Sequence, residues 1–422
     1  MMQILIKGAK IIDKNSPYYH QVTNVLISDG IITKITTESL NADRVIDAEG
    51  QLLSIGWFDM RTTIGEPGYE YKEDIESVCE AAIAGGYTEI ASLPNTKPVV
   101  QSKNVVSFIK SKCRDLLVEI HPMAAVTHNL EGKEITEMMD LHHAGAVAFT
   151  DGEFPIWHSD VMLKTLQYLQ PLDALLISHA EDNQISHFGQ MNESIESTML
   201  GLKGIPKIAE ELMVERDLSI LNYTGGKLHF AHISSPKSLE MIKIAKQNGL
   251  SVTCDIAAYQ LLLDDTLIKS FDTNLKVNPP LRSPEDTELL KTYLIDGTID
   301  VIVSDHIPQD VESKKLEFDL AEFGMIGLET AYGALSMALD GVMDIEKLID
   351  KFTYAPRNIL KTKLPRIEEN HVANLTLFSP NEEWVLELRD IKSKSKNTPF
   401  IGKKLKGKVK AVFNKSKYRV FN

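Results

Sequence analysis

Residues 300–308 read DVIVSDHIP, an apolar run that ends abruptly in charged and polar side chains. Further runs of the same kind precede it, each rich in Val, Ile, Leu and Ala and each followed by a helix-like segment. They start at residues 52, 88, 119, 146, 174, 227 and 251. Near-continuous apolar strands that alternate with helices are typical of a parallel sheet covered on both faces. Eight such units predict an α/β fold, a closed (β/α)8 TIM barrel.

The ends of these runs are as informative as their apolar bodies. In a TIM barrel the carboxyl ends of the strands build the active site, so polar residues at those ends are expected to converge on one mouth. The polar strand-end residues are Asp59, Asn95, Thr127, Asp151, His179, His232 and Asp305. The sequence therefore predicts a single polar site at the carboxyl end of the barrel.

The two ends of the chain have a different character. ILIKGAKIID near the N-terminus and LKGKVKAVF near the C-terminus are typical of short strands separated by glycine turns. We expect both ends to fold together into one small β-sandwich beside the barrel. The predicted organisation is residues 1–51 for the first part of the sandwich, 52–370 for the barrel and 371–422 for the second part of the sandwich.

Composition narrows the class of protein. The 422 residues are 43% hydrophobic and carry a formal net charge of −14, which disfavours nucleic acid as a partner because phosphate neutralisation needs basic surfaces. No run approaches the length of a membrane span and no secretory signal is visible, so a cytoplasmic protein without a membrane role is expected. Cys79, Cys113 and Cys254 have no paired spacing and are predicted to be buried thiols.

The charge is unevenly distributed along the chain. The stretch 392–422 contains ten Lys and Arg419 but no Asp or Glu. One interpretation is a set of edge strands protected by solvated lysines. The other is a docking surface for an acidic partner.

Imidazoles and carboxylates at strand ends indicate metal-assisted hydrolysis. Two zinc ions bridged by hydroxide can hydrolyse an amide near neutral pH, because the metals lower the pKa of bound water and polarise the carbonyl group. Such a site needs histidines and acids from several strands and a further carboxylate to move protons. The chain offers His179, His232, Asp151 and Asp305 in these places.

At this level of detail the sequence resembles the dihydroorotases, of the type found in multifunctional or carbamoyltransferase-associated assemblies. The pairing of KVNPPLR with SDHIP is specific to that family, and the resemblance extends over almost the whole chain. The motifs that carry it are EPGYEYKEDIES from Glu66, SLPNTKPV from Ser92, KVNPPLRSPED from Lys276, SDHIP from Ser304, EFGMIGLET from Glu322 and KSKNTPFIG from Lys394.

The resemblance implies roles for particular residues. Asp151, His179 and His232 match metal ligands of the family, and Asp305 matches the acid that acts in catalysis. Asn95 and Asn278 match residues that hydrogen-bond dihydroorotate. The implied cofactor is zinc, and the implied substrate is dihydroorotate or a related cyclic amide.

The chain departs from the family at the first strand. Where the family has a motif like DxHxHxREPG, this chain has DMRTTIGEPG, so Arg61 and Thr63 replace two metal-binding histidines. Gly65 replaces an arginine that binds the substrate carboxylate. Residues i and i+2 of a strand point the same way, and a protonated guanidinium cannot ligate a cation. We therefore expect one zinc at most, or none.

The same substitution leads to a structural prediction. An Arg61 guanidinium in the place of the missing metal would neutralise Asp305 or Asp151, since buried carboxylates without a counter-ion are costly. The alternative is an Arg61 side chain turned outward to solvent at the rim of the barrel.

Three functional hypotheses follow. The leading one is a dihydroorotase-family protein of pyrimidine biosynthesis that has lost hydrolysis and survives as a structural partner of aspartate carbamoyltransferase. The second is a working hydrolase with a single zinc on Asp151, His179 and His232. The third is a metal-free binding protein. For the family, a homodimer is the expected assembly.

Overall fold

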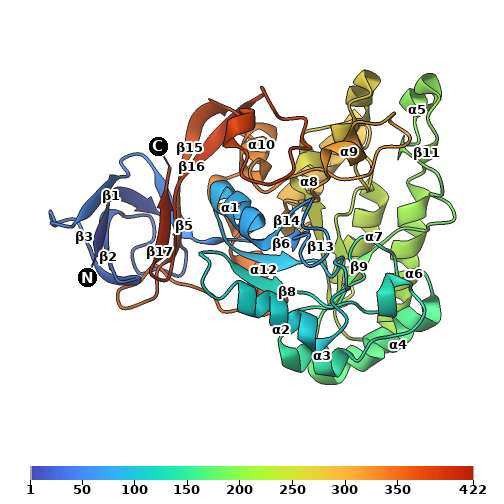
Figure 1. Cartoon of the computed structure of the whole chain (residues 1–422), viewed down its shortest axis with the longest axis horizontal. Helices are drawn as coiled ribbons and strands as arrows, with labels where there is room; N and C mark the ends of the chain where they lie inside the picture. The colour runs from blue at the N-terminus through green and yellow to red at the C-terminus, as the bar shows by residue number, and fades with distance from the viewer. Residues whose placement is uncertain (1, 422) are drawn as a thin grey trace.

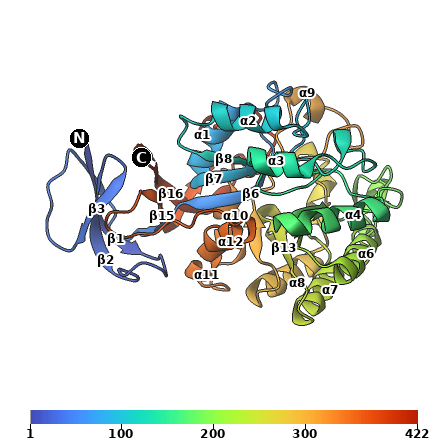
Figure 2. The same ribbon diagram turned by 90° about the horizontal axis from the view of Figure 1, so that it is seen from below.

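The computed structural model describes residues 2–421, in which a large barrel lies beside a small sheet that contains both chain ends (Figures 1 and 2). The parallel barrel strands fall into two hydrogen-bonded groups. The first group is β6 (Trp57–Thr62), β7 (Tyr87–Ser92) and β8 (Glu119–Pro122), and the second is β9 (Leu176–His179), β12 (Leu228–Ala231), β13 (Val252–Ala257) and β14 (Val301–Val303).

Isolated bridges join the two groups into a ring. Phe149 bridges Ala124 on one side and Leu176 on the other, and Thr62 pairs with His306. All three bridges are parallel, like the pairing within each group. The predicted TIM barrel is thus confirmed, with the run at 146–152 contributing a bridge at Phe149 rather than a longer strand.

Helices surround the barrel strands. Their starts follow sequence signals: the Asp74 side chain accepts a hydrogen bond from the Ser77 N–H ahead of α1, and α7 begins with Pro236. The α-helices are α1 (Ile75–Gly85), α2 (Lys103–Lys112), α3 (Met138–Ala144), α4 (Ser159–Leu169), α5 (Ile195–Leu200), α6 (Ile208–Thr224), α7 (Pro236–Gln247), α8 (Pro284–Ile295), α9 (Val311–Lys314), α10 (Ala331–Ala338), α11 (Ile345–Asp350) and α12 (Tyr354–Leu360). The short 3-10 turns are η1 (His128–Leu130), η2 (Gln170–Leu172), η3 (Ala258–Leu261), η4 (Asp265–Ser270), η5 (Thr273–Leu275) and η6 (Leu388–Asp390), and a small pair β10 (Met191–Asn192) and β11 (Gly204–Ile205) lies apart from the barrel.

Both ends of the chain share one sheet, in the order β17-β16-β15-β5-β1-β2-β3, with β4 paired to β1. These strands are β1 (Gln3–Ile11), β2 (Val22–Ser28), β3 (Ile31–Thr36), β4 (Arg44–Asp47), β5 (Leu52–Ile55), β15 (Asn374–Val385), β16 (Lys404–Asn414) and β17 (Lys417–Val420). The join between the two ends is the antiparallel pairing of β5 with β15. Because β5 begins at Leu52, the small sheet extends past the predicted boundary at residue 51.

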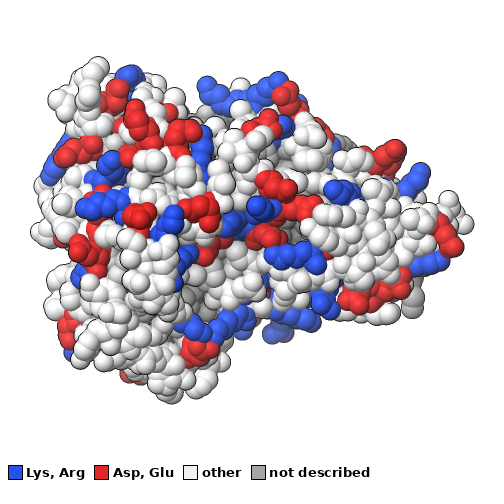
Figure 3. All heavy atoms as spheres, turned by 180° about the vertical axis from the view of Figure 1, so that it is seen from behind, with Lys and Arg blue, Asp and Glu red and all other residues white. Residues whose placement is uncertain are grey.

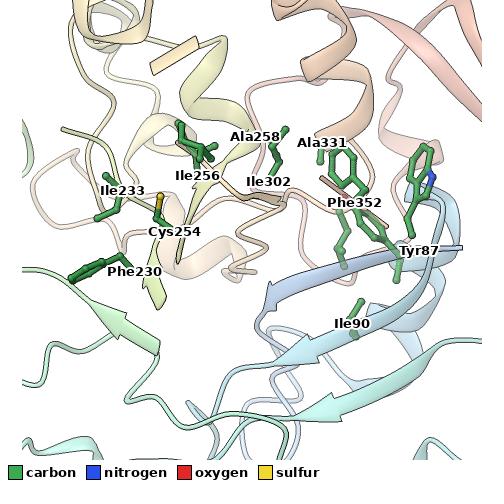
Figure 4. Close-up of a cluster of buried hydrophobic side chains, with 14 of the residues drawn as sticks. Tyr87, Ile90, Phe230, Ile233, Cys254, Ile256, Ala258, Ile302, Ala331 and Phe352 are labelled. Carbon is green, nitrogen blue, oxygen red and sulfur yellow. The ribbon is translucent and has the colours of Figure 1, made fainter. Parts of the chain in front are cut away.

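The barrel has a continuous apolar core. Trp57 is fully buried, and its ring lies against the rings of Tyr87, Tyr332, Phe352 and Phe378. Figure 4 shows Phe352 and Tyr87 at one side of this cluster and Phe230 and Cys254 at the other. The three cysteines are free and buried, as predicted.

The basic stretch at the C-terminus is largely neutralised within the chain. Its lysines and arginine pair with acidic residues of the barrel and of the sheet, and Figure 3 shows both signs of charge interspersed on one face of the molecule. The pairs are Lys394–Asp74, Lys404–Glu383, Lys406–Asp340, Lys408–Glu382, Lys410–Glu382, Lys415–Glu119 and Arg419–Glu80. This pattern favours solvated, charge-paired strands over a docking surface for an acidic partner. Within residues 2–421, the helices are too short or too polar to cross a membrane.

Candidate active site

Arg61, at the end of β6, is buried in the barrel mouth and contacts Asp305. Its Nε donates to Asp305 Oδ1 at 2.7 Å, and the two residues are 2% and 1% exposed. The other guanidinium nitrogens reach only the Gly152 carbonyl oxygen, at 3.4 and 3.5 Å. The predicted contact between Arg61 and an acid is therefore confirmed, and the solvent-facing alternative is wrong.

Tyr259 completes the surroundings of Asp305. Its hydroxyl donates to Asp305 Oδ2 at 2.5 Å, so both carboxylate oxygens have a partner. Burial, followed by the charge of Asp305, raises the pKa of Tyr259 well above its ordinary value. The tyrosine consequently stays protonated and serves as a donor. Arg61, Asp305 and Tyr259 form a self-neutralised cluster.

Two residues of the mouth have unusual backbone conformations. His232 and Asp305 have φ values of 40° and 48°, a left-handed region that non-glycine residues rarely adopt. The His232 N–H donates to Asp255 Oδ1 at 2.6 Å, and Asp255 Oδ2 in turn contacts His229 Nε2 at 2.8 Å. Such strain is concentrated at functional sites, where surrounding contacts hold it in place.

His179 and His232 lie against each other with their rings stacked. The distance from His179 Nδ1 to His232 Nε2 is 2.9 Å, so one ring donates to the other. Burial, the Arg61 charge and the His179 charge all lower the pKa of His232 well below its ordinary value. His232 is therefore neutral, and among the described residues its Nδ1 has no hydrogen-bond partner.

Glu181 continues this chain of contacts toward the surface. Its Oε2 accepts from Asn278 Nδ2 and contacts His179 Nε2, both at 2.9 Å. Burial alone would raise the pKa of Glu181, but the hydrogen bond and charge of His179, with help from Asn278, bring it down to about 2. An ionised carboxylate thus stands beside Asn278, one of the two predicted substrate-binding amides.

Asp151 is directed into the neighbouring backbone. Its Oδ1 accepts from the Val126 and Thr127 N–H groups, both at 2.9 Å, and its Oδ2 accepts from the Thr127 hydroxyl at 2.5 Å. Burial raises the pKa of Asp151 to about 6, although these hydrogen bonds oppose the shift. The carboxylate is committed to holding the turn at residues 126–127.

The other predicted site residues, Gly65, Thr63 and Asn95, are closely surrounded by neighbouring groups. Gly65 has φ 67°, and a Cβ placed there would lie 2.2 Å from the Glu73 carbonyl oxygen, so this backbone position accepts no side chain. The Thr63 hydroxyl points to Glu153 Oε1 at 3.4 Å. Asn95 bonds the Asp151 carbonyl and the Glu153 N–H, both at 3.4 Å.

The residues present do not fit a metal centre. Arg61 brings a positive charge to the mouth, Asp151 has both oxygens engaged, and His179 and His232 direct nitrogens at each other. Among residues 2–421, no group of three or more His, Cys, Asp or Glu side chains is arranged to hold a metal ion. His306 offers no replacement ligand, because it is fully buried with Nε2 at 3.3 Å from Glu73 and Nδ1 at 3.3 Å from the Gly327 N–H.

Two residues of the cluster were missed by sequence reasoning. Tyr259 lies in AAYQ, just after β13, but nothing in the sequence pairs its hydroxyl with Asp305. Glu153 follows Asp151 by two residues and faces Thr63. Partial burial raises the pKa of Glu153, while the Arg61 charge opposes that shift. Only the tertiary contacts reveal these roles.

The fold, a TIM barrel beside a small sheet that contains both chain ends, is shared by solved hydantoinases. An L-hydantoinase (dihydropyrimidinase) from Arthrobacter aurescens superposes with a TM-score of 0.85, covering 100% of this chain and 98% of its own, at 22% identity. A D-hydantoinase (dihydropyrimidinase) from a Thermus species gives 0.81 at 20% identity, over 99% and 95% of the two chains. At such identities these likenesses concern the fold alone, a TIM barrel with a β-sandwich domain.

Sequence comparison identifies the family. The Dihydro-orotase-like family model matches residues 50–238. A dihydroorotase from Syntrophus aciditrophicus is 42% identical over 97% of both chains, and one from Acetivibrio thermocellus is 41% identical over 96% of both. The chain belongs to the dihydroorotase family, whose members typically depend on a metal such as zinc.

Proposed function

We propose that this chain is a dihydroorotase-family protein that no longer hydrolyses dihydroorotate and that acts as a structural partner of aspartate carbamoyltransferase. The observation that carries the loss of hydrolysis is the buried ion pair between Arg61 and Asp305. In this proposal Asp151, His179 and His232 are remnants of a metal site, Asp305 is a former catalytic acid, and Asn95 and Asn278 are remnants of a substrate site.

Electrostatics supports the loss of metal. A guanidinium is permanently charged and has only donors, so its presence beside Asp305 opposes a divalent cation in the same space. Ligation through His179 Nδ1 or His232 Nε2 would break their 2.9 Å hydrogen bond, and the other nitrogen of His232 lies 3.9 Å from Asp305, which is already paired with Arg61. Freeing Asp151 would leave the buried N–H groups of residues 126 and 127 without an acceptor, at a cost of about 1–3 kcal/mol each. A single-zinc hydrolase therefore requires a rearranged mouth.

The substrate side supports the same proposal. Dihydroorotate carries a carboxylate, and the position that would hold its arginine clamp is Gly65, where no side chain fits. The ionised Glu181 beside Asn278 repels an anion at close range. No arginine clamp at position 65 offsets this repulsion. Cyclic amides without a carboxylate avoid this repulsion.

Zinc content and hydrolysis test the proposal together. We expect the purified chain to hold less than about 0.2 zinc per chain and to show no dihydroorotate turnover, since catalytic zinc sites typically use three protein ligands and Asp151 is engaged by residues 126–127. The double variant Arg61→His with Thr63→His restores the two imidazoles and is expected to gain zinc, while each single variant serves as a matched control. About one zinc with turnover in the unmodified chain would instead establish the single-zinc hydrolase.

The partner is tested by co-expression. We expect the chain to co-purify with aspartate carbamoyltransferase in a stoichiometric complex during size-exclusion chromatography, and to be a homodimer alone. Because the basic C-terminal stretch is paired within the chain, this association should survive moderate salt. Absence of any complex, together with absence of zinc, would favour the metal-free binding protein.

A further inference from the structure

A cavity of about 260 Å³ lies away from the barrel mouth, between the barrel and the C-terminal hairpin. Helices α1 and α10 form one side, strands β15 and β16 form the other, and the segment after η6 borders it. Figure 1 shows α1 and α10 beside this hairpin. Small-molecule sites are commonly found between domains, where concave surfaces of two units meet. The cavity is independent of the proposed loss of hydrolysis.

The walls of the cavity are aromatic and aliphatic. Tyr332 comes from α10, Trp384 from β15, and Phe421 from the end of the chain, with Leu386 and Val409 between them. The Trp384 Nε1 donates to the Gly407 carbonyl oxygen at 2.9 Å, which fixes the indole plane. Flat aromatic walls favour a flat apolar ligand, and their faces attract positive charge.

One buried carboxylate lines the same cavity. Glu329 is 9% exposed, and its Oε1 accepts from the backbone N–H groups of Lys392 and Ser393. Its Oε2 has no hydrogen-bond partner among the described residues. Burial raises the pKa of Glu329, with the backbone hydrogen bonds opposing the shift. A carboxylate oxygen in the lining of a cavity that has no protein donor leaves a position for a donor from a ligand.

The charges of His306 and Lys396 partly oppose the rise in the pKa of Glu329, but His306 contacts Glu73 and the Lys396 ammonium donates to the Ile391 and Ser393 carbonyl oxygens. The Lys408 ammonium pairs with Glu382 at 3.4 Å, and the Lys392 ammonium donates to the Arg389 carbonyl oxygen at 3.4 Å. Asp390 at the border adds a second negative charge. The ligand that suits these walls and this carboxylate is flat, aromatic and positively charged at one N–H edge.

We propose that the cavity between α10 and the β15–β16 hairpin binds a small aromatic cation of the amidinium type, with its ring against Tyr332 and Trp384 and its N–H edge on Glu329. An amidinium presents two coplanar donors, which a carboxylate accepts with better geometry than it accepts a single ammonium donor. The site is separate from the polar cluster at Arg61 and needs no metal.

Benzamidine is the probe. Isothermal titration on the full chain is expected to show saturable binding of one molecule per chain. Tryptophan fluorescence should change on a Trp157→Phe background, because Trp384 lines the cavity and Trp57 packs against Tyr332. Benzamide has the same shape without the charge and should bind at least about tenfold more weakly, as expected for loss of a charge-assisted hydrogen bond. Affinity for benzamidine should fall as the pH is lowered through the raised pKa of Glu329.

Two variants and one control decide the outcome. Glu329→Gln should weaken benzamidine binding at least about tenfold, and Ala84→Leu should abolish it by filling the cavity. Glu383→Gln makes the same chemical change on β15 outside the cavity and should leave binding intact. Thermal unfolding verifies that each variant folds. If Glu329→Gln does not fold, Ala84→Leu still tests the proposal. Absence of saturable binding at about 10 mM, or equal binding by the folded variants, would overturn the proposal.

Discussion

Two buried arginine–carboxylate pairs lie at opposite ends of the same barrel. At the end that faces the small sheet, Arg357 Nη2 and Nε donate to Glu89 Oε1 at 2.7 and 3.2 Å, and Arg357 Nη1 donates to the Thr353 carbonyl oxygen at 2.9 Å. At the mouth, only the Nε of Arg61 has a strong acceptor, Asp305. All three guanidinium nitrogens of Arg357 have acceptors within 3.2 Å. Two guanidinium nitrogens of Arg61 have only the Gly152 carbonyl oxygen, at 3.4 and 3.5 Å.

The two ends of a TIM barrel have different roles, which accounts for the difference between the two arginine pairs. The amino ends of the strands contribute to stability, and Glu89 there also accepts from Asn374 of β15 and contacts His121. The carboxyl ends carry chemistry, and the Arg61 pair occupies positions that the family resemblance assigns to a metal site. The salt bridge at the mouth thus stands where the resemblance places a metal site, while the one at the opposite end lies beside Asn374 of the small sheet.

The largest effect is expected from Arg357→Met. Removing the guanidinium leaves Glu89 buried without its main counter-charge, which should cost about 4 kcal/mol of unfolding free energy. Urea unfolding followed by circular dichroism measures the loss. The control is Arg366→Met, whose partner Glu368 lies on the surface, and where a change below about 1 kcal/mol is expected. A small loss in Arg357→Met would remove the distinction between the two ends.

Arg61→Met is expected to cost less, about 3 kcal/mol, because Asp305 keeps the hydrogen bond from Tyr259. The same urea titration measures this loss. Tyr259→Phe should lower the unfolding free energy by more in the Arg61→Met background than in the unmodified chain. If Arg61→Met were neutral, the guanidinium would not be balancing a buried charge, and the comparison would fail.

Dependence on pH should have opposite signs at the two ends. The pKa of Glu89 is lowered from 4.5 to about 2, because the Arg357 charge and the His121 contact outweigh burial. Its contribution is present above pH about 4.5 and is lost as the pH falls toward about 2. The pKa of Asp151 is raised from 3.8 to about 6, so its contribution is present below pH about 4 and is lost as the pH rises through about 6.

Each shift corresponds to a change on the order of 3 kcal/mol across its window. Unfolding free energies of Glu89→Gln and Asp151→Asn, measured from about pH 2 to about pH 8 against the unmodified chain, should diverge in opposite pH ranges. Parallel profiles for the unmodified chain and Asp151→Asn between pH about 4 and about 6 would contradict the assignment at the mouth.

The smallest effect is expected at the basic C-terminal strands. Lys404 and Glu383 form a pair in which both side chains are more than half exposed, and Lys404→Ala should change the unfolding free energy by less than about 0.5 kcal/mol. Thermal unfolding at low and high salt measures it. A larger loss would show that these lysines contribute more than solvation and charge pairing.

Much of the fold was accessible from the sequence, because apolar runs and their polar ends repeat eight times along the chain. The fourth run is the exception, since in the structure it provides two isolated bridges at Phe149 rather than a longer strand. The border at residue 52 was placed too early, since Leu52–Ile55 reads equally well as a barrel strand or as a strand of the small sheet. Only its pairing with β15 decides between them.

The sequence by itself determined the family, the barrel and the presence of Arg61 and Thr63 near the end of the first barrel strand, because these depend on residue type and spacing. Tertiary structure alone decided that Arg61 turns inward to Asp305, that Tyr259 takes the second carboxylate oxygen, and that Asp151 is committed to residues 126–127. These contacts join residues up to 244 positions apart in the chain. Their geometry follows from closure of the barrel, which no local pattern encodes.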